Sequence, residues 1–351
     1  MKKTIALILA VLMLLPCCLT AVAAASLPGI EEEETFGIAD GFVRTREVFQ
    51  DDRSRVTTQW IYDEDGALTQ KVRKTVDEED GASTERTTYT YDISGALTKA
   101  VTSFKAQHGY AKKTVTAYAY DSKGNLVKKA EKWSNNNGCS GKSTGVYTYD
   151  RRDLLVKYSF KDVDVDGVTK EAIVYSYNQN GDLVKEVRVN KNDHRTEKEV
   201  TVNAYDADGN LVKTACKCCR NGELDEAYTK TYVYNADGKP VKAKYSDPAG
   251  KYGIRKATAV YTYRADGTLK KIVESGAGEH TSYTGALFYD ANENLTKETC
   301  TTRYDSGEVD SYTTTFTYDA DGNLLKTDYS GGTFGYDPPF TRTYTYQKIA
   351  A

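Results

Sequence analysis

Three aspartates at alternate positions have the best spacing in this sequence for binding a metal ion. Asp162, Asp164 and Asp166 precede Gly167, which matches the beginning of a D-x-D-x-D-G calcium loop. Calcium takes several hard oxygen ligands, and alternate residues of a tight loop can supply them. The twelfth loop position carries Ile173 instead of the glutamate that usually completes the site. The two interpretations are an incomplete calcium site and an acidic hairpin turn, and the sequence favours the turn.

A group of three cysteines is the second candidate site. Cys216, Cys218 and Cys219 could bind a soft metal through thiolates, or they could pair as cystine. Three thiols without a clear fourth ligand are a weak zinc motif, so cystine pairing is favoured in an exported chain. Cys139 and Cys300 bring the cysteines after residue 25 to an odd number. At least one thiol must therefore stay free or bond to another chain.

Catalytic motifs are missing from the sequence. It contains no G-x-S-x-G, no H-E-x-x-H and no phosphate-binding loop. Its three histidines, His108, His194 and His280, are 86 residues apart and fall in or near variable turns. A catalytic histidine needs a nucleophile or carboxylate beside it, and the sequence indicates none. We predict that the protein is not an enzyme and has no cofactor, calcium excepted.

A tyrosine-centred repeat organises most of the chain. Aspartate or asparagine usually follows the repeated tyrosine, glycine stands four residues after it, leucine six and lysine eight. The repeated tyrosines are 62, 91, 120, 149, 177, 205, 234, 263, 289, 318 and 346, at spacings of 26 to 29 residues. Arg264 replaces the aspartate and Pro240 the leucine in one copy each.

Each repeat predicts two β-strands. Segments such as 116–120 alternate tyrosine with threonine, alanine or valine, which is a strand pattern. Turns such as 206–210 combine aspartate, which bonds its own backbone, with glycine, which accepts positive φ. The predicted fold is all-β: tandem antiparallel hairpins that form an extended, curved or spiralling, solenoid-like sheet.

Alternation also predicts tyrosine ladders on one face of this sheet. Such ladders could be the spine of the sheet or a platform on which sugars stack, and the structural role is favoured. The candidate ligand-binding residues are Tyr89, Tyr91, Tyr118, Tyr120, Tyr147, Tyr149, Tyr175 and Tyr177.

The repeated Tyr-x-Tyr-Asp-x-x-Gly-x-Leu-x-Lys motif resembles the YD-repeat, or RHS-repeat, family of bacterial surface proteins and toxin shells. The resemblance covers about residues 58 to 346. It implies hairpins wound into a curved or spiralling sheet. The unit is longer than the family's usual repeat and no toxin domain follows, so only the hairpin architecture is carried over.

A longer period of about 86 residues is superimposed on the repeat. The histidines mark the first unit of each set of three, and the cysteines from Cys139 to Cys300 mark the second. Copying of a three-hairpin block explains this pattern, and it is favoured over a coil with three hairpins per turn. In an uncoiled sheet Cys216 and Cys300 would lie six strands apart, about 29 Å, too far for a disulfide.

The N-terminus indicates export. Lys2 and Lys3 precede an apolar run and an A-x-A pattern, so residues 1–25 are predicted to be a cleaved signal peptide. Lipid attachment at Cys18 is the less favoured alternative. Residues 26–57 are predicted to be an irregular acidic lead-in, and residues 58–351 the repeat domain of about ten units. The expected localisation is secreted or extracellular.

Charge and composition narrow the predicted function. Without the signal lysines the formal net charge changes from −3 to −5, which argues against nucleic acid or an anionic membrane as the main partner. We expect a non-enzymatic protein that binds or adheres to a glycan, cell-wall polymer or surface protein. The alternatives are a structural protein that assembles through sheet edges, a scaffold related to toxin shells and, least favoured, a hydrolase.

Overall fold

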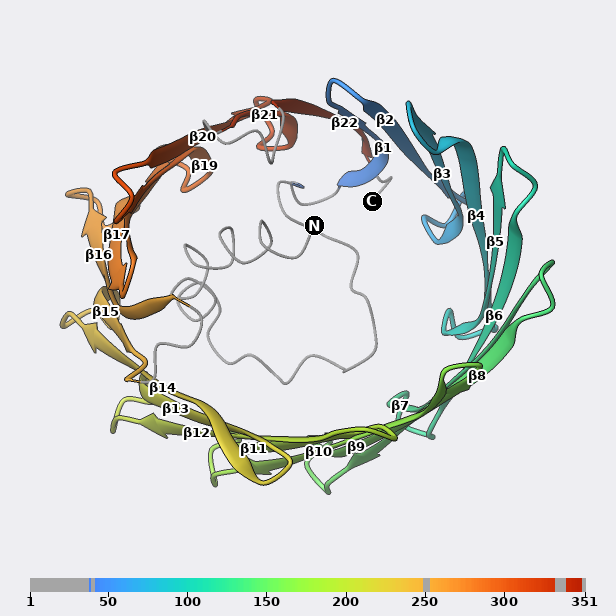
Figure 1. Cartoon of the computed structure of the whole chain (residues 1–351), viewed down its shortest axis with the longest axis horizontal. Helices are drawn as coiled ribbons and strands as arrows, with labels where there is room; N and C mark the ends of the chain where they lie inside the picture. The colour runs from blue at the N-terminus through green and yellow to red at the C-terminus, as the bar shows by residue number, and fades with distance from the viewer. Residues whose placement is uncertain (1–37, 39–41, 249–252, 332–338, 349–351) are drawn as a thin grey trace.

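The computed structural model describes residues 38, 42–248, 253–331 and 339–348. These residues contain one antiparallel sheet of 22 strands that closes into a cylinder (Figure 1). The strands are β1 (Phe42–Gln50), β2 (Ser54–Tyr62), β3 (Leu68–Asp77), β4 (Gly81–Tyr91), β5 (Leu97–Ala106), β6 (Ala111–Tyr120), β7 (Leu126–Asn135), β8 (Ser140–Tyr149), β9 (Leu155–Asp164), β10 (Gly167–Tyr177), β11 (Leu183–Lys191), β12 (Thr196–Tyr205), β13 (Leu211–Arg220), β14 (Glu223–Tyr234), β15 (Pro240–Ser246), β16 (Ile254–Tyr263), β17 (Leu269–Gly278), β18 (Thr281–Tyr289), β19 (Leu295–Tyr304), β20 (Val309–Tyr318), β21 (Leu324–Ser330) and β22 (Phe340–Lys348). The prediction of an all-β antiparallel fold is confirmed.

Closure of the sheet corrects the predicted open or spiralling arrangement. Strand β1 pairs antiparallel with β22, with Val48 opposite Thr343, and every other strand pairs with its neighbours in the chain. The predicted solenoid-like sheet is therefore wrong, because the curvature of successive hairpins brings the two end strands together after one circuit. Cys216 and Cys300 lie in β13 and β19, six strands apart, and both are free thiols, as an uncoiled sheet requires.

The lead-in is shorter than predicted. Residues 42–50 form β1, so the irregular segment predicted for 26–57 is wrong from Phe42 onward. The predicted signal peptide, Cys18 and residues 26–37 lie outside the described residues. Within residues 38, 42–248, 253–331 and 339–348 there is no helix of the length and hydropathy needed to cross a membrane.

The repeated aspartate closes each turn by capping backbone amides. In the turn after β12, Asp206 Oδ1 accepts hydrogen bonds from the amides of Asp208 (3.0 Å) and Asn210 (2.8 Å), and Oδ2 accepts one from the Asn210 side chain (3.0 Å). The glycine four residues after the tyrosine has positive φ, 73° to 94° over the copies. Asp153 and Glu293 take this left-handed conformation where glycine is replaced, at φ 61° and 62°.

The repeated tyrosine ties each hairpin to the preceding one. Its hydroxyl donates to a backbone carbonyl oxygen 18 to 23 residues earlier, at 2.7 to 3.0 Å, and in eight of ten copies this carbonyl belongs to the repeated leucine. The structure gives a role to Arg264, which replaces the repeated aspartate in one copy. Its Nη1 donates to the Leu269 carbonyl (2.7 Å), the acceptor that the tyrosine hydroxyl uses in other copies.

Successive hairpins are staggered along the cylinder. Lys128 lies opposite Ala119 on one side and Val146 on the other, whereas Lys157 lies opposite Thr148, two residues further along β8. On every even-numbered strand except β18, the residue opposite the lysine position of the following strand lies two residues further along than the residue opposite the lysine position of the preceding strand. About one residue of stagger per strand corresponds to a strand tilt of about 36°. Equivalent residues of successive repeats therefore form belts around the cylinder.

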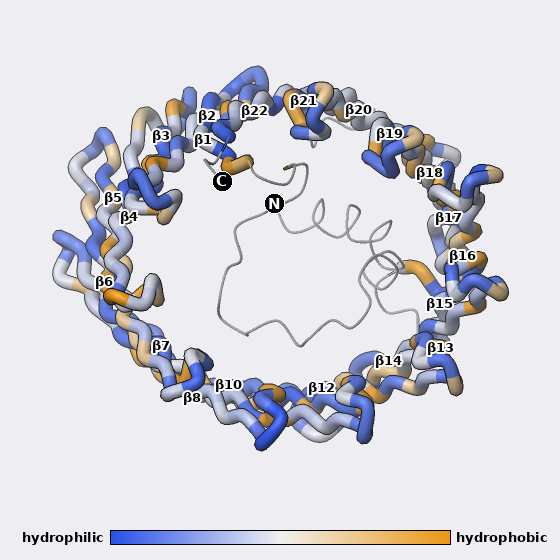
Figure 2. Tube along the Cα trace, turned by 180° about the vertical axis from the view of Figure 1, so that it is seen from behind, coloured by the Kyte–Doolittle hydropathy of each residue, from blue (hydrophilic) through white to orange (hydrophobic). Residues whose placement is uncertain are grey.

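The two faces of the sheet differ in crowding. Apart from Val72, the buried side chains within the strands lie on the face of the repeated tyrosines, among them Tyr158 and Ile173. In a single curved layer, side chains converge on the concave face and spread apart on the convex face. We infer that the tyrosine face lines the interior and that the alternate positions face outward. Figure 2 shows hydrophilic and hydrophobic residues interspersed around the whole cylinder.

Acid should weaken the turns. Hydrogen bonds from Asn210 are the first cause that lowers the pKa of Asp206, and the same direction holds for Asp92, Asp121, Asp150 and Asp319. A lowered folded-state pKa contributes stability above the unfolded pKa of about 3.9 that is lost as pH falls through the folded value. We expect the melting temperature to begin falling near about pH 5 and to go on falling as the pH drops through the lowered folded-state pKa values of these aspartates. Asp206→Asn, which keeps the capping oxygen, should melt lower than the parent at pH 7, and the difference should shrink as the pH falls below about 4; a difference in melting temperature that does not change with pH would contradict the assignment.

The Tyr283 ring should leave no room for a side chain larger than glycine at position 276. A Cβ at Gly276 would lie 2.3 Å from Tyr283 Cε1 and 3.1 Å from the Lys256 carbonyl oxygen, while φ is not positive there. Gly276→Ala should lower the free energy of unfolding by about 1–3 kcal/mol through overpacking, measured by denaturant unfolding. Ser275→Ala, one residue away on the outer face, is the control and should change it by less than about 0.5 kcal/mol. A neutral Gly276→Ala would show that the Tyr283 ring is free to move.

Candidate functional site

The predicted tyrosine ladder lies on the inner wall of the cylinder, in β4, β6, β8 and β10. Tyr147 and Tyr175 are buried, and the other six members are half-buried. The Tyr147 and Tyr158 rings pack with centroids 5.0 Å apart, and Ile173 lies opposite Tyr158 in the pairing of β9 with β10. The hydroxyls of Tyr91, Tyr120, Tyr149 and Tyr177 donate to leucine carbonyls. The structure brings these residues together as an inner lining, with half of the hydroxyls used in the wall itself.

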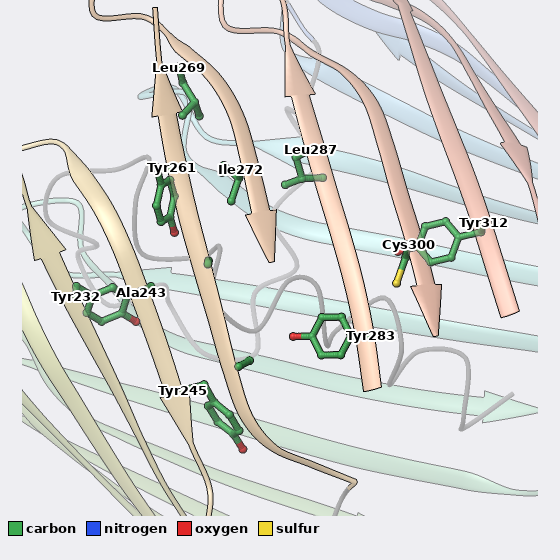
Figure 3. Packing of buried hydrophobic residues seen from close by; sticks show 12 residues of the cluster. Tyr232, Ala243, Tyr245, Tyr261, Leu269, Ile272, Tyr283, Leu287, Cys300 and Tyr312 are labelled. Atoms are coloured by element: carbon green, nitrogen blue, oxygen red, sulfur yellow. The ribbon is translucent and has the colours of Figure 1, made fainter. Parts of the chain in front are cut away.

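A second aromatic cluster lines the wall from β14 to β20 (Figure 3). The Tyr228 and Tyr245 rings lie 5.6 Å apart, as do those of Tyr312 and Tyr329. Alanines of very low exposure, such as Ala243 and Ala259, lie on the same inner face between the rings. The repeat tyrosines thus continue around the cylinder, and the ladder is not confined to the strands named from the sequence.

Carboxyl groups are set among the inner rings, and the sequence reasoning missed them. Glu274 is 2% exposed and accepts a hydrogen bond from the Tyr283 hydroxyl. Burial raises the pKa of Glu274 to about 7, against the opposing effects of Tyr283 and Lys230. Glu298 accepts from the Tyr312 hydroxyl at 2.9 Å, and burial raises its pKa as well. The sequence contained the information needed to find them, because period-two alternation places both Glu274 and Glu298 on the same face as the tyrosines.

The predicted calcium loop does not assemble as a ligand cluster. Asp162 and Asp164 end β9, and Asp164 Oδ1 accepts a hydrogen bond from the Asp166 amide at 2.9 Å, which is turn capping. In the described part of the chain no group of three or more histidine, cysteine, aspartate or glutamate side chains is placed to hold a metal ion. The acidic-turn interpretation therefore accounts for these residues, and the calcium hypothesis is not supported.

The three clustered cysteines are separated by strand geometry and remain free. Cys216 and Cys218 alternate onto the inner face, whereas Cys219 follows a register shift in the pairing with β14. Among the described residues the structure shows these three thiols unpaired and places no group of side chains to hold a metal ion, so the favoured cystine pairing and the alternative thiolate site both remain predictions from the sequence. The Cys216 thiol instead donates to Glu199 Oε1 at 3.4 Å, and burial raises its pKa to about 11.

The repeated lysines form a belt on the outer face. Each lies opposite the residue just before the repeated tyrosine, for example Lys99 opposite Thr90 and Lys213 opposite Ala204, and so points away from the tyrosine face. The belt comprises Lys99, Lys128, Lys157, Lys185, Lys213, Lys242, Lys271, Lys297 and Lys326, with Arg46 and Gln70 at the corresponding positions of β1 and β3. Two strand spacings and a two-residue stagger place neighbouring members about 12 Å apart.

Further lysines extend the belt over β7 to β13. The outward lysines of these strands are Lys128, Lys132, Lys142, Lys157, Lys161, Lys170, Lys185, Lys191, Lys198, Lys213 and Lys217. The glutamates of the same strands, Glu131, Glu171, Glu186, Glu197 and Glu199, share the inner face with the tyrosines. We call this surface the lysine face. The outer face of β7 to β13 thus carries eleven lysines, whereas the glutamates of these strands lie on the inner face together with Lys129, Arg188 and Arg220.

Comparison with known proteins gives structural likeness only. No protein-family model matches the chain, and no curated protein does. Among solved structures, the chain is similar to the TcdB2–TccC3–Cdc42 complex (TM-score 0.28, 12% identity, 82% of this chain and 19% of that one). It is also similar to the Photorhabdus luminescens Tc holotoxin pore with TccC3-D651A (0.26, 12%, 84% and 21%). A porin-like protein from Bacteroides uniformis matches with TM-score 0.28 and 11% identity over 90% of this chain and 98% of that one.

These likenesses carry no functional argument. The chain spans about a fifth of the length of the two toxin chains it matches. The resemblance to YD repeats therefore stays a prediction from the motif, alongside a low-identity structural similarity to toxin complexes.

The buried thiols should be unreactive at neutral pH. Burial raises the pKa of Cys216 and Cys300 to about 11, and a thiol attacks only as the thiolate. With the folded protein at pH 7.5, iodoacetamide should alkylate Cys139 well before Cys216 and Cys300, as followed by peptide mass spectrometry. Labelling of all three should become equal in denaturant. Equal rates in the folded state, or a Cys216 disulfide in a non-reduced digest, would contradict the buried placement.

Proposed function

We propose that this protein is a non-enzymatic, exported binding protein that uses its lysine face to hold an acidic glycan or acidic cell-wall polysaccharide. The observation that carries the proposal is the sorting of charge over β7 to β13, with eleven outward lysines and the glutamates turned inward. A continuous surface of one sign attracts a polymer of the opposite sign over its whole length.

The geometry of the lysine face favours a long, flexible polyanion. The cations are spread along a convex wall with spacings of about 12 Å along the belt, so no single small ligand can contact many of them. A chain with regularly repeated negative charges can contact them in succession, and each contact adds to the total. Among the belt lysines, Lys157, Lys185 and Lys213 are exposed.

The distribution of charge changes the inference drawn from net charge. The formal charge of −3 counts inner glutamates and outer lysines together. A ligand on the outside is separated from inner carboxylates such as Glu186 and Glu199 by the sheet, and it meets the lysine side chains first. The acidic balance of the chain is therefore no argument against an anionic partner at this surface.

The alternative of assembly through sheet edges loses its physical basis. Because β1 and β22 pair with each other, each of the 22 described strands has a partner on both sides. Free edges are what allow sheets to pair end to end. Binding through a side-chain surface is consequently the better supported role.

Polyanion binding should depend on the lysine face and on salt. A variant with Lys157→Gln, Lys185→Gln and Lys213→Gln should bind a polyuronate at least about tenfold more weakly than the parent, measured by biolayer interferometry in low salt. Raising the salt from about 0.05 M to 0.5 M should weaken parental binding by a similar factor, because the contacts are screened.

The control removes the same charge from the inner wall. Lys71→Gln, Arg73→Gln and Lys129→Gln change three cations that face inward with Trp60, Thr58 and Tyr118. This variant has the same net charge as the outer one and should keep parental affinity. Equal losses in both variants, or binding of a neutral polysaccharide as strong as that of the polyuronate, would overturn the proposal.

A further inference from the structure

We propose that a hollow on the lysine face over β8 to β11 is a subsite for one hexuronate residue of the polymer, an inference that rests on the proposed function and names its ligand. The hollow has a volume of about 560 Å³, within the range of small-molecule sites. Eight of its ten lining residues occupy outward positions that alternate with the inner tyrosines, and the other two, Phe160 and Glu171, occupy inner-face positions of β9 and β10.

The floor of the hollow consists of small side chains. Ser159 lies between Val146 of β8 and Ala172 of β10 in the strand pairing, and Val189 lies opposite Ala172. None of these side chains is long enough to fill the space that the neighbouring lysines surround. Thr144 adds a hydroxyl beside Lys161 at the same level of the wall. The floor therefore offers a mostly apolar surface with two hydroxyl groups.

One side of the hollow is a row of ammonium groups. Lys161 lies opposite Lys170, and Lys170 lies opposite Lys191, so three lysines follow one another across β9, β10 and β11. All three are exposed, and no ion pair joins any of them to a carboxylate in the described part of the chain. Adjacent like charges on neighbouring strands are unfavourable, and an anion placed between them relieves the repulsion.

A hexuronate matches this combination better than other anions. A pyranose ring has an apolar face of C–H groups that can pack on valine and alanine, and hydroxyls that can bond Ser159 and Thr144. Its carboxylate, at one end of the ring, would meet the row of Lys161, Lys170 and Lys191. A free phosphate would use the lysines and leave the apolar floor uncovered, and a neutral sugar would use the floor and leave the lysines unpaired.

A pair of equivalent outer positions, one inside the hollow and one outside it, allows the hollow to be tested separately from the lysines. Ser159 stands four residues after the repeated leucine of β9, and Ala215 holds the same position of β13, also on the outer face. Ser159→Trp should fill the hollow, whereas Ala215→Trp places the same bulk on the outer face beyond it. Both variants keep every lysine.

The test uses the full mature chain and an oligogalacturonate tetramer as probe, with calorimetry as the readout. We expect Ser159→Trp to weaken tetramer binding at least about tenfold and Ala215→Trp to leave it unchanged. The neutral tetramer of the same sugar length and inorganic phosphate should both bind the parent more weakly than the oligogalacturonate. Circular dichroism and melting temperature verify that both variants are folded.

Three outcomes would overturn the subsite. They are unchanged tetramer affinity in Ser159→Trp, phosphate binding as tight as the tetramer, and no tetramer binding by the parent at millimolar concentration. In each case the long polyuronate tested against the outer-lysine variant decides separately whether the lysine face itself binds polyanions. The two measurements therefore separate a failure of the subsite alone, in which the polyuronate still binds, from a failure of the whole lysine face, in which neither ligand binds.

Discussion

The hydrogen bond that ten of the eleven repeated tyrosines donate to a carbonyl of the preceding hairpin is the interaction on which the cylinder depends. A sheet one layer thick has no second layer against which to bury apolar surface, so its hairpins must be held by contacts within the layer. Tyrosine meets both needs, since its ring covers the inner face while its hydroxyl donates to a leucine carbonyl at 2.8 to 3.0 Å or, at Tyr263, to the Pro240 carbonyl at 2.7 Å. In one copy the guanidinium of Arg264 donates to the leucine carbonyl instead of a tyrosine hydroxyl, so this carbonyl is bonded even where the tyrosine does not reach it.

Once the tyrosines occupy the inner face, strand alternation decides where every charge goes. Lysine eight residues after the tyrosine must point outward, and glutamates in phase with the tyrosines must point inward. The inner carboxyls then sit among rings, where burial raises the pKa of Glu274 to about 7, while the outer lysines stay in solvent. Two chemically different surfaces arise from one short motif, and the polyanion-binding proposal concerns only the outer one.

The three-hairpin superperiod is a record of sequence copying rather than of a coil. Cys216 and Cys300 take equivalent inner positions six strands apart, and each lies opposite a tyrosine, Tyr228 and Tyr312 respectively. Equivalent blocks thus lie side by side around the wall instead of stacking. The recurrence of Cys216 and Cys300 therefore corresponds to one inner-wall position that carries a small buried thiol in two blocks.

Sequence alone determined the hairpin unit, its turns, the antiparallel order and the common face of Tyr89, Tyr118, Tyr147 and Tyr175, because these depend on local turn chemistry and period-two alternation. Tertiary structure decided that β1 meets β22 and that the tyrosine face is the inner one. Closure depends on curvature and stagger summed over all 22 strands, and no local pattern encodes that sum. The same reason explains why net charge alone cannot tell which charges lie inside and which lie outside: the two faces become inside and outside only after the sheet has closed.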